Sequence, residues 1–268
     1  MGIINVTPDS FSDGSQFQSS TSSRGFSVDI SKVLKTVASM IEEGATFIDV
    51  GGESTRPGAM TVSEQEELSR VIPVIEAVRS NFDVCISVDT SSPATMKAAI
   101  EAGAEVVNDV RALSRVGALE VVAESNAAVC LMHMQGQPSS MQQSVSYSDV
   151  LQEVFAFLQS RIRGSLDAGI DCSRIMIDPG FGFGKSLDHN FQLLKHLARF
   201  EELELPLLVG ISRKSMIGGA TDRPVDQRLA GSIAATMPAL AGGAKIIRTH
   251  DVAATMDAIR VHCALLDA

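Results

Sequence analysis

The stretch IMIDPGFGFGKS, residues 175–186, joins a short β-branched run to a glycine-rich turn and ends in Gly-Lys-Ser. A phosphate-binding P-loop needs a glycine five positions before the glycine of Gly-Lys-Ser. Counting back from Gly184 gives Pro179, so that pattern is not met. A dinucleotide-binding pattern that starts at Gly180 also fails, because position 185 is lysine. The stretch instead predicts a strand, a connecting loop and the start of a helix.

This loop has two interpretations. Its glycines can let the backbone approach a planar ligand closely, with Phe181 or Phe183 packed on that ligand. The alternative is a tight turn with one phenylalanine in the core. The residue pattern favours the ligand loop.

Seven further runs rich in Val, Ile, Leu and Met resemble the start of this stretch. Each is almost continuously apolar, as expected of strands that are buried on both faces of a parallel sheet. The eight predicted strands cover residues 2–7, 46–52, 85–90, 105–110, 129–134, 175–180, 207–212 and 245–250.

Amphipathic helical patterns lie between these runs, as in residues 29–44, where apolar residues recur every three or four positions. Eight alternating strand and helix units predict an α/β fold, a closed (β/α)8 TIM barrel in a single domain over residues 1–268. An open doubly wound sheet is the alternative. It is disfavoured because the first strand–helix turn lacks a GxGxxG motif and no change of composition marks a second domain.

The composition argues against several classes of protein. The net charge of −10 disfavours nucleic-acid binding, which usually needs a basic surplus. No apolar run is long enough to span a membrane, and the first residues lack a signal-peptide pattern. The four cysteines lack CxxC spacing, which predicts reduced thiols in or near the core. We therefore expect a cytoplasmic enzyme that binds small molecules and neither nucleic acid nor membrane.

Polar residues stand at or just after the end of every predicted strand. They are Asn5, Thr7, Asp49, Glu53, Asp89, Asn108, Asp109, His133, Asp178, Ser212, Arg213, Lys214, Arg248 and His250. In a barrel these strand ends meet at one mouth, where active sites are built. Because unpaired burial of charge is costly, this regularity predicts a catalytic mouth.

Eight motifs follow one another over nearly the whole chain: GIINVTPDSFSDG, DVGGESTRPG, SVDT, NDV, MHMQG, DPGFGFGK, LLVGISRKSMIG and IIRTHDV. In these motifs the sequence resembles the dihydropteroate synthase family of folate biosynthesis, whose members are (β/α)8 barrels. The resemblance implies a transferase that joins 6-hydroxymethyl-7,8-dihydropterin diphosphate to p-aminobenzoate, with Mg²⁺ as cofactor. Diphosphate would leave first or early, and the arylamine would then attack the pterin methylene.

The chemistry of a pterin agrees with four of the strand-end residues. A carboxylate such as Asp178 can accept two parallel N–H bonds from the ring, which is also the role that the resemblance implies. Asn108 offers a donor and an acceptor, Asp89 a further acceptor, and Lys214 a donor. Helix capping or structural pairing is the alternative role for Asp89 and Asp178.

The remaining roles depend mainly on the resemblance. Arg248 and His250 precede a helix expected near Asp251, a common phosphate position in barrels, and would bind the diphosphate with Thr55 and Arg56. The resemblance places p-aminobenzoate among six residues: Phe11, Thr55, Pro57, Phe183, Lys214 and Ser215. Asn5 would be an oxygen ligand of Mg²⁺. Asp178, Lys214, Arg248 and His250 are the predicted catalytic residues.

Two rival functions remain at this point. A pterin-binding methyltransferase would share Asp89, Asn108 and Asp178 but would not need Arg248 and His250. The other rival is a pterin-binding protein without turnover. It is disfavoured because every charged residue that the chemistry requires is present in the sequence. The resemblance also implies a homodimer formed through late helices, with residues 227–243 small and apolar enough for such a contact, and sensitivity to sulfonamides.

Overall fold

The computed structural model describes residues 1–7, 17, 28–54, 62–137, 141–142 and 145–268. One parallel sheet lies at the centre, and its strands neighbour one another in chain order. The strands are β1 (Gly2–Asn5), β2 (Phe47–Gly51), β3 (Cys85–Asp89), β4 (Val106–Asp109), β5 (Ala128–Met132), β6 (Ile175–Asp178), β7 (Leu207–Val209) and β8 (Ala244–Ile247). All eight predicted strands are thereby confirmed.

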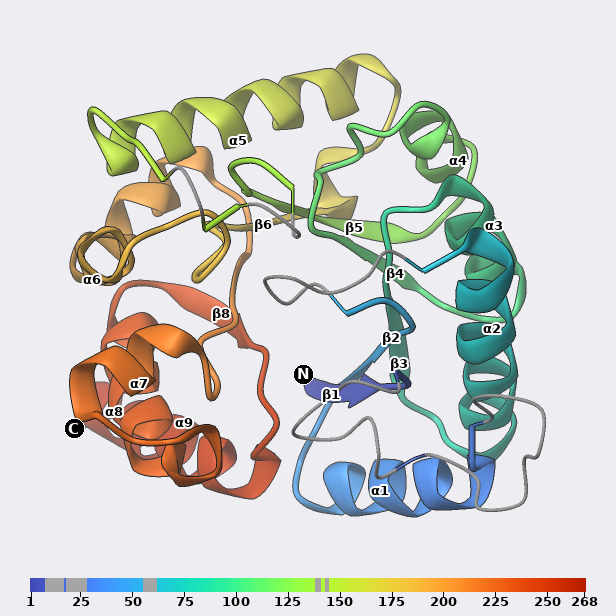
Figure 1. Ribbon diagram of the computed structural model, residues 1–268, viewed down its shortest axis with the longest axis horizontal. Coiled ribbons are helices and arrows are strands. Elements are labelled where there is room, and N and C mark those ends of the chain that lie inside the picture. Colours follow the sequence, from blue (N-terminus) through green and yellow to red (C-terminus); the bar gives the residue numbers. More distant parts are fainter. Residues whose placement is uncertain (8–16, 18–27, 55–61, 138–140, 143–144) are drawn as a thin grey trace.

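The two edges of the sheet are also hydrogen-bonded to each other. Ile3 N–H donates to the Thr249 carbonyl at 3.2 Å, and Thr249 N–H donates to the Met1 carbonyl at 2.9 Å. Gly2 and Thr249 form a parallel bridge. The helices follow in chain order around the outside of the strands (Figure 1). The architecture is that of an α/β barrel, as predicted.

The helices occupy the connections between strands. They are α1 (Ile30–Glu42), α2 (Glu64–Asn81), α3 (Pro93–Glu101), α4 (Ala118–Ala123), α5 (Val150–Asp167), α6 (Leu187–Lys195), α7 (Ser215–Thr221), α8 (Leu229–Ala241) and α9 (Val252–Leu266), with short 3₁₀ turns at η1 (Cys172–Arg174), η2 (Leu197–Leu203) and η3 (Val225–Gln227). The predicted helix near Asp251 is α9, whose N-cap residue is Asp251. The β7–β8 connection contains both α7 and α8.

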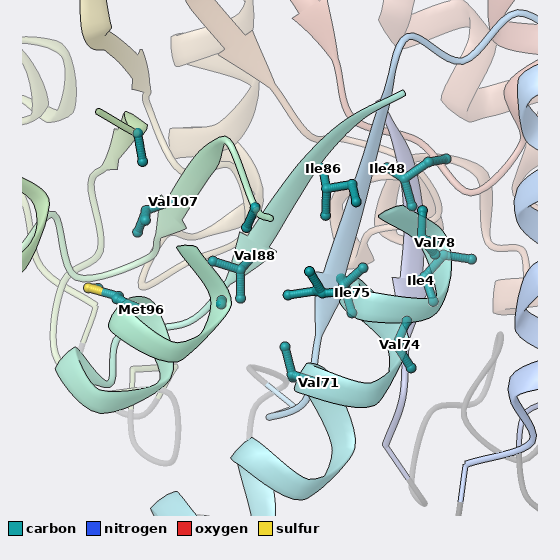
Figure 2. Close-up of a cluster of buried hydrophobic side chains, with 14 of the residues drawn as sticks. Ile4, Ile48, Val71, Val74, Ile75, Val78, Ile86, Val88, Met96 and Val107 are labelled. Atoms are coloured by element: carbon teal, nitrogen blue, oxygen red, sulfur yellow. The ribbon is translucent and has the colours of Figure 1, made fainter. Parts of the chain in front are cut away.

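Alternate residues of each strand face either the surrounding helices or the interior of the barrel. The outward set packs against the helices; Figure 2 shows Ile4, Ile48, Ile86 and Val88 beside the apolar side of α2. The inward set forms a separate apolar layer that includes Val106, Cys130, Met176 and Leu208. Two positions further along β4 and β6 the inward residues are Asn108 and Asp178, so the polar residues lie above an apolar floor.

The cysteine prediction is partly wrong. All four cysteines are free, and Cys130 is buried, but Cys172 and Cys263 are exposed. They lie in the short turn η1 and on α9, where the sequence pattern gave no sign of the exposed side. No helix in the described part of the chain is long and apolar enough to cross a membrane. The cytoplasmic location stays a prediction.

Candidate active site

A cavity of about 440 Å³ opens at the carboxyl ends of the strands. Every strand end contributes to its wall. The lining includes Asn5 and Thr7 after β1, Glu53 after β2, Asp89 of β3, Asn108 of β4, Met132 of β5, Asp178 of β6, Ser212, Lys214 and Ser215 after β7, and Arg248 and His250 after β8. The prediction of a common polar mouth is confirmed for most of the strand-end residues, but Asp49, Asp109 and His133 are buried and do not line the cavity.

The predicted site residues divide into two groups. Nine line this cavity: Asn5, Asp89, Asn108, Asp178, Phe183, Lys214, Ser215, Arg248 and His250. Phe11, Thr55, Arg56 and Pro57 lie outside the described residues. The chain therefore brings together every predicted site residue that the structure describes.

One half of the cavity is built around Asp178 and Lys214. Asp178 is 4% exposed, and its Oδ1 accepts the Gly180 N–H at 2.7 Å. Burial raises the pKa of Asp178, although Lys214 and the Gly180 N–H oppose this rise. The Lys214 ammonium donates to the Phe181 carbonyl at 2.5 Å and lies 4.7 Å from the centre of the Phe183 ring. Burial lowers the pKa of Lys214 to about 8, with Asp178 opposing.

The other half contains a network of three charged side chains. Arg248 Nε donates to Asp49 Oδ2 at 2.6 Å, and one terminal nitrogen of Arg248 donates to Asp89 Oδ2 at 2.8 Å. Burial alone would lower the pKa of Arg248, but Asp49 and Asp89 raise it above its usual value. Burial raises the pKa of Asp89, against the attraction of Arg248. Asp89 therefore has a structural partner in Arg248 and also borders the cavity.

Asn108 connects this network to the floor of the cavity. Its Nδ2 donates to Asp49 Oδ2 at 3.2 Å, and the same carboxylate accepts the Ser87 hydroxyl at 2.6 Å. One donor of Asn108 is thus already used within the protein, and its amide oxygen is left for a ligand. Asp49 itself is fully buried beneath the cavity wall.

The loops after β7 and β8 are joined at two points. Ser212 Oγ lies 3.0 Å from His250 Nδ1 and accepts the His250 N–H at 3.2 Å. Arg213 forms a bidentate pair with Asp251, with Nε to Oδ2 at 2.9 Å. Lys214 follows Arg213, and His250 precedes Asp251. These contacts therefore fix the position of Lys214, in one half of the cavity, relative to His250, in the other half.

The Gly-Lys-Ser sequence has a structural explanation. Lys185 is 3% exposed, and its Nζ donates to the Gly180 and Phe183 carbonyls at 2.8 and 3.1 Å and lies 2.9 Å from His133 Nδ1. Burial lowers the pKa of Lys185 well below its usual value. This lysine holds its own loop against the loop after β5 and does not line the cavity wall.

Two glycines of this loop serve the same contact. Gly180 and Gly184 have φ of +73° and +60°, and a Cβ would lie 1.8 Å from the His133 carbonyl and 2.4 Å from the Gln135 carbonyl, respectively. These two glycines permit close approach to protein backbone, which corrects the ligand-loop interpretation for them, whereas Gly182 does line the cavity. Phe183 and Phe181 both border the cavity, as that interpretation requires, although Phe181 is also packed into the core and fully buried.

Asn5 has the chemistry of a minor ligand for a hard cation. Its side chain lines the cavity and makes no hydrogen bond within the described part of the chain. The same part of the chain contains no group of three or more His, Cys, Asp or Glu that could hold a metal ion. Mg²⁺ commonly uses few protein oxygens and is otherwise held by phosphate and water. The residues present agree with that type of site.

Sequence reasoning gave no role to four residues of this region. Asp49 was one of many strand-end acids, and its contact with Arg248 joins positions 199 residues apart. The Arg213–Asp251 pair and the Lys185 contacts also depend on how loops meet in space. A charged residue within an otherwise apolar strand, as in TFIDVGG (46–52), was the one signal available for Asp49.

Comparisons with known proteins agree with this geometry. The profile of the family described as pterin binding enzyme matches residues 1–250. Dihydropteroate synthase of Haemophilus influenzae is 53% identical over 261 residues, which cover 97% of this chain and 91% of that protein. A crystal structure of Yersinia pestis dihydropteroate synthase in a sulfonamide drug complex is 49% identical, with a TM-score of 0.94 and coverage of 100% and 94% of the two chains. The Xanthomonas albilineans dihydropteroate synthase with 4-aminobenzoic acid is 48% identical, with a TM-score of 0.90 and coverage of 100% and 93%.

Proposed function

This chain belongs to the family of pterin-binding enzymes, and we infer from its site how it catalyses the dihydropteroate synthase reaction. The enzyme condenses 6-hydroxymethyl-7,8-dihydropterin diphosphate with p-aminobenzoate to give 7,8-dihydropteroate and diphosphate. The observation that carries the assignment of roles is the convergence of Asn108, Asp178, Lys214 and Arg248 on one cavity. We propose that residues 1–268 form one (β/α)8 domain around it.

The pterin ring is bound across the floor of the cavity, between Asp178 in one half and Asp89 in the other. The Asp178 carboxylate accepts the ring N–H and amino donors, and Asn108 presents its amide oxygen to the adjacent edge. Asp89 supplies a further acceptor through the oxygen that does not contact Arg248. Lys214, next to both Asp178 and the Phe183 ring, donates to the carbonyl side of the pterin.

The diphosphate lies toward Arg248 and His250. Arg248 has five N–H donors and uses two of them on Asp49 and Asp89, so three remain for phosphate oxygens. His250 borders the same part of the cavity. Thr55 and Arg56 are proposed to approach from the second loop. Asn5 would provide one oxygen ligand to Mg²⁺, which supplies positive charge beside the leaving group.

Bond cleavage precedes bond formation. The C–O bond between the pterin methylene and diphosphate breaks, and its electron pair leaves with the diphosphate. Arg248 and His250 stabilise that developing negative charge. The lone pair of the p-aminobenzoate nitrogen then forms the C–N bond, and the arylammonium proton passes to solvent. Positioning of the two substrates provides most of the rate enhancement, since no strong base is required.

The p-aminobenzoate site lies beside Phe183, Lys214 and Ser215, with Phe11, Thr55 and Pro57 proposed to complete it. Sulfonamides resemble p-aminobenzoate in shape and should compete with it. Steady-state inhibition by sulfamethoxazole should therefore be competitive toward p-aminobenzoate. Inhibition that is independent of the p-aminobenzoate concentration would contradict this assignment.

A homodimer is proposed through the late helices. An apolar groove of about 370 Å³ lies among α6, α7 and α8 and is lined mainly by Phe191, Leu194, Ile217, Ala220, Ala234, Ala235 and Pro238. Phe191 is 37% exposed, and nearby Leu187 and Leu229 are 41% and 43% exposed. A second copy of the chain would cover these apolar side chains.

Incorporation of radiolabelled p-aminobenzoate, coupled to measurement of released diphosphate, tests the proposed roles. Asp178→Ala should abolish binding of 6-hydroxymethylpterin, whereas Arg248→Ala should retain it and weaken inhibition by inorganic diphosphate. Thermal unfolding would verify that both variants fold. Full activity in both variants would overturn the site.

A further inference from the structure

Asp49 is a fully buried carboxylate that does not reach the cavity, yet it contacts two residues that do. Its neighbour Ile48 packs outward against α2 (Figure 2), so the alternation of the strand directs Asp49 into the barrel. There its carboxylate accepts hydrogen bonds from Ser87, Asn108 and Arg248. No part of the reaction described above uses Asp49 directly.

The contact with Asn108 determines which way the Asn108 amide faces. An amide group has a donor end and an acceptor end of almost the same shape, so either can occupy a given place. The Asn108 donor end lies 3.2 Å from Asp49 Oδ2. Rotation of the amide by 180° would place its oxygen against the carboxylate oxygen, which is repulsive.

Arg248 ensures that Asp49 remains an acceptor. A guanidinium group has only donors and stays protonated, and its Nε lies 2.6 Å from the same Oδ2 that Asn108 contacts. Two donors therefore converge on one oxygen, which acts as the acceptor for both. The salt bridge between Arg248, which follows β8, and Asp49 on β2 thus determines the orientation of the Asn108 amide on β4.

We propose that Asp49 is a positioning residue that sets substrate specificity by holding the Asn108 amide oxygen toward the ligand. This inference rests on the role proposed above for Asn108. A pterin presents an acceptor nitrogen next to its 2-amino donor. A lumazine, in which a carbonyl replaces the 2-amino group, presents the reverse order of donor and acceptor on that edge. A freely rotating Asn108 would accommodate both edges, whereas a fixed amide favours one.

The test compares binding of 6-hydroxymethylpterin and 6-hydroxymethyllumazine to the full chain by calorimetry. The discrimination is the ratio of the two dissociation constants. Asp49→Ala should lower this discrimination about tenfold, because the amide can then turn to meet either ligand. Asp49→Asn keeps an oxygen toward Arg248 and Asn108 and should retain the discrimination within about threefold. Asp49→Ser, whose hydroxyl can donate or accept, should behave like the alanine variant and replaces it if alanine prevents folding.

Asp109 provides a matched control on the next residue of β4. It is also fully buried, but it accepts from the Ser91 hydroxyl and from the Arg111 and Leu113 N–H groups and contacts neither Asn108 nor Arg248. Asp109→Ala should lower the unfolding temperature without changing the discrimination. The inference is wrong if Asp49→Ala and Asp49→Ser discriminate as the wild type does, or if Asp109→Ala lowers the discrimination equally. Failure of the wild type to bind the pterin would instead refute the proposed site.

Discussion

Replacement of Lys185 by methionine should destabilise the enzyme and weaken its active site. The change keeps the length of the side chain but removes the donors to the Gly180 and Phe183 carbonyls and the contact with His133 Nδ1. Each buried acceptor left without a partner costs about 1 kcal/mol or more, giving about 3 kcal/mol for the three. Removal of a buried amine offsets part of this loss, so we expect a net loss of about 2 kcal/mol in the free energy of unfolding.

For a chain of this length that loss corresponds to a fall of about 4–8 °C in the unfolding temperature. Differential scanning calorimetry measures it directly. The KM for p-aminobenzoate should rise in the same variant, because Phe183 is held by this lysine and lines the cavity. Lys97 is exposed on α3, and Lys97→Met is the control that should change neither value. An unchanged unfolding temperature and KM in Lys185→Met would refute the structural role of the Gly-Lys-Ser lysine.

Three further results are expected. The kcat/KM for the pterin substrate should fall as the pH rises through about 8, because burial lowers the pKa of Lys214 to that value and the neutral amine loses its charge-assisted hydrogen bond. The Lys214→Arg variant stays protonated and should lack this fall. If kcat/KM of that variant still falls near pH 8, the assignment to Lys214 is contradicted. Removal of divalent cations by a chelator should lower the rate. The Asn5→Ala variant should need more Mg²⁺ for half-maximal activity than the wild type. An equal Mg²⁺ concentration for half-maximal activity in both proteins would exclude Asn5 as a ligand. Light scattering should give the mass of a dimer for the wild type and of a monomer for Phe191→Glu, whereas a monomeric wild type would refute the proposed interface.

The fold could be predicted because its signals are local. Each strand is a continuous apolar run, and each helix carries its own stripe, so the order of elements can be read without knowledge of distant contacts. The mouth of the barrel follows from that order, because parallel strands that alternate with helices bring all their carboxyl ends to one side. Seven of the nine site residues that line the cavity stand at strand ends and could be located by this reasoning, whereas Phe183 and Ser215 were placed there by the family resemblance.

The interactions among those residues could not be predicted in the same way. The sequence gives no distance between Asp49 and Arg248, which meet only because the last strand returns to the first. Lys185 illustrates the opposite case, in which a local pattern resembles a phosphate-binding motif but a neighbouring loop provides the partners. Loop contacts depend on side-chain packing across the barrel and have no periodic signature.

The pairing of charges explains how the site tolerates so many buried ionisable groups. An unpaired charge in the barrel would be strongly destabilising, but Arg248 is shared by Asp49 and Asp89, and Asp178 lies near Lys214. The substrate can therefore add bonds without breaking these pairs, because Arg248 keeps three donors and Asp89 keeps one oxygen. Rigid pairs of this kind hold the binding groups in place before the substrate arrives, which reduces the entropy lost on binding and the reorganisation needed as diphosphate leaves.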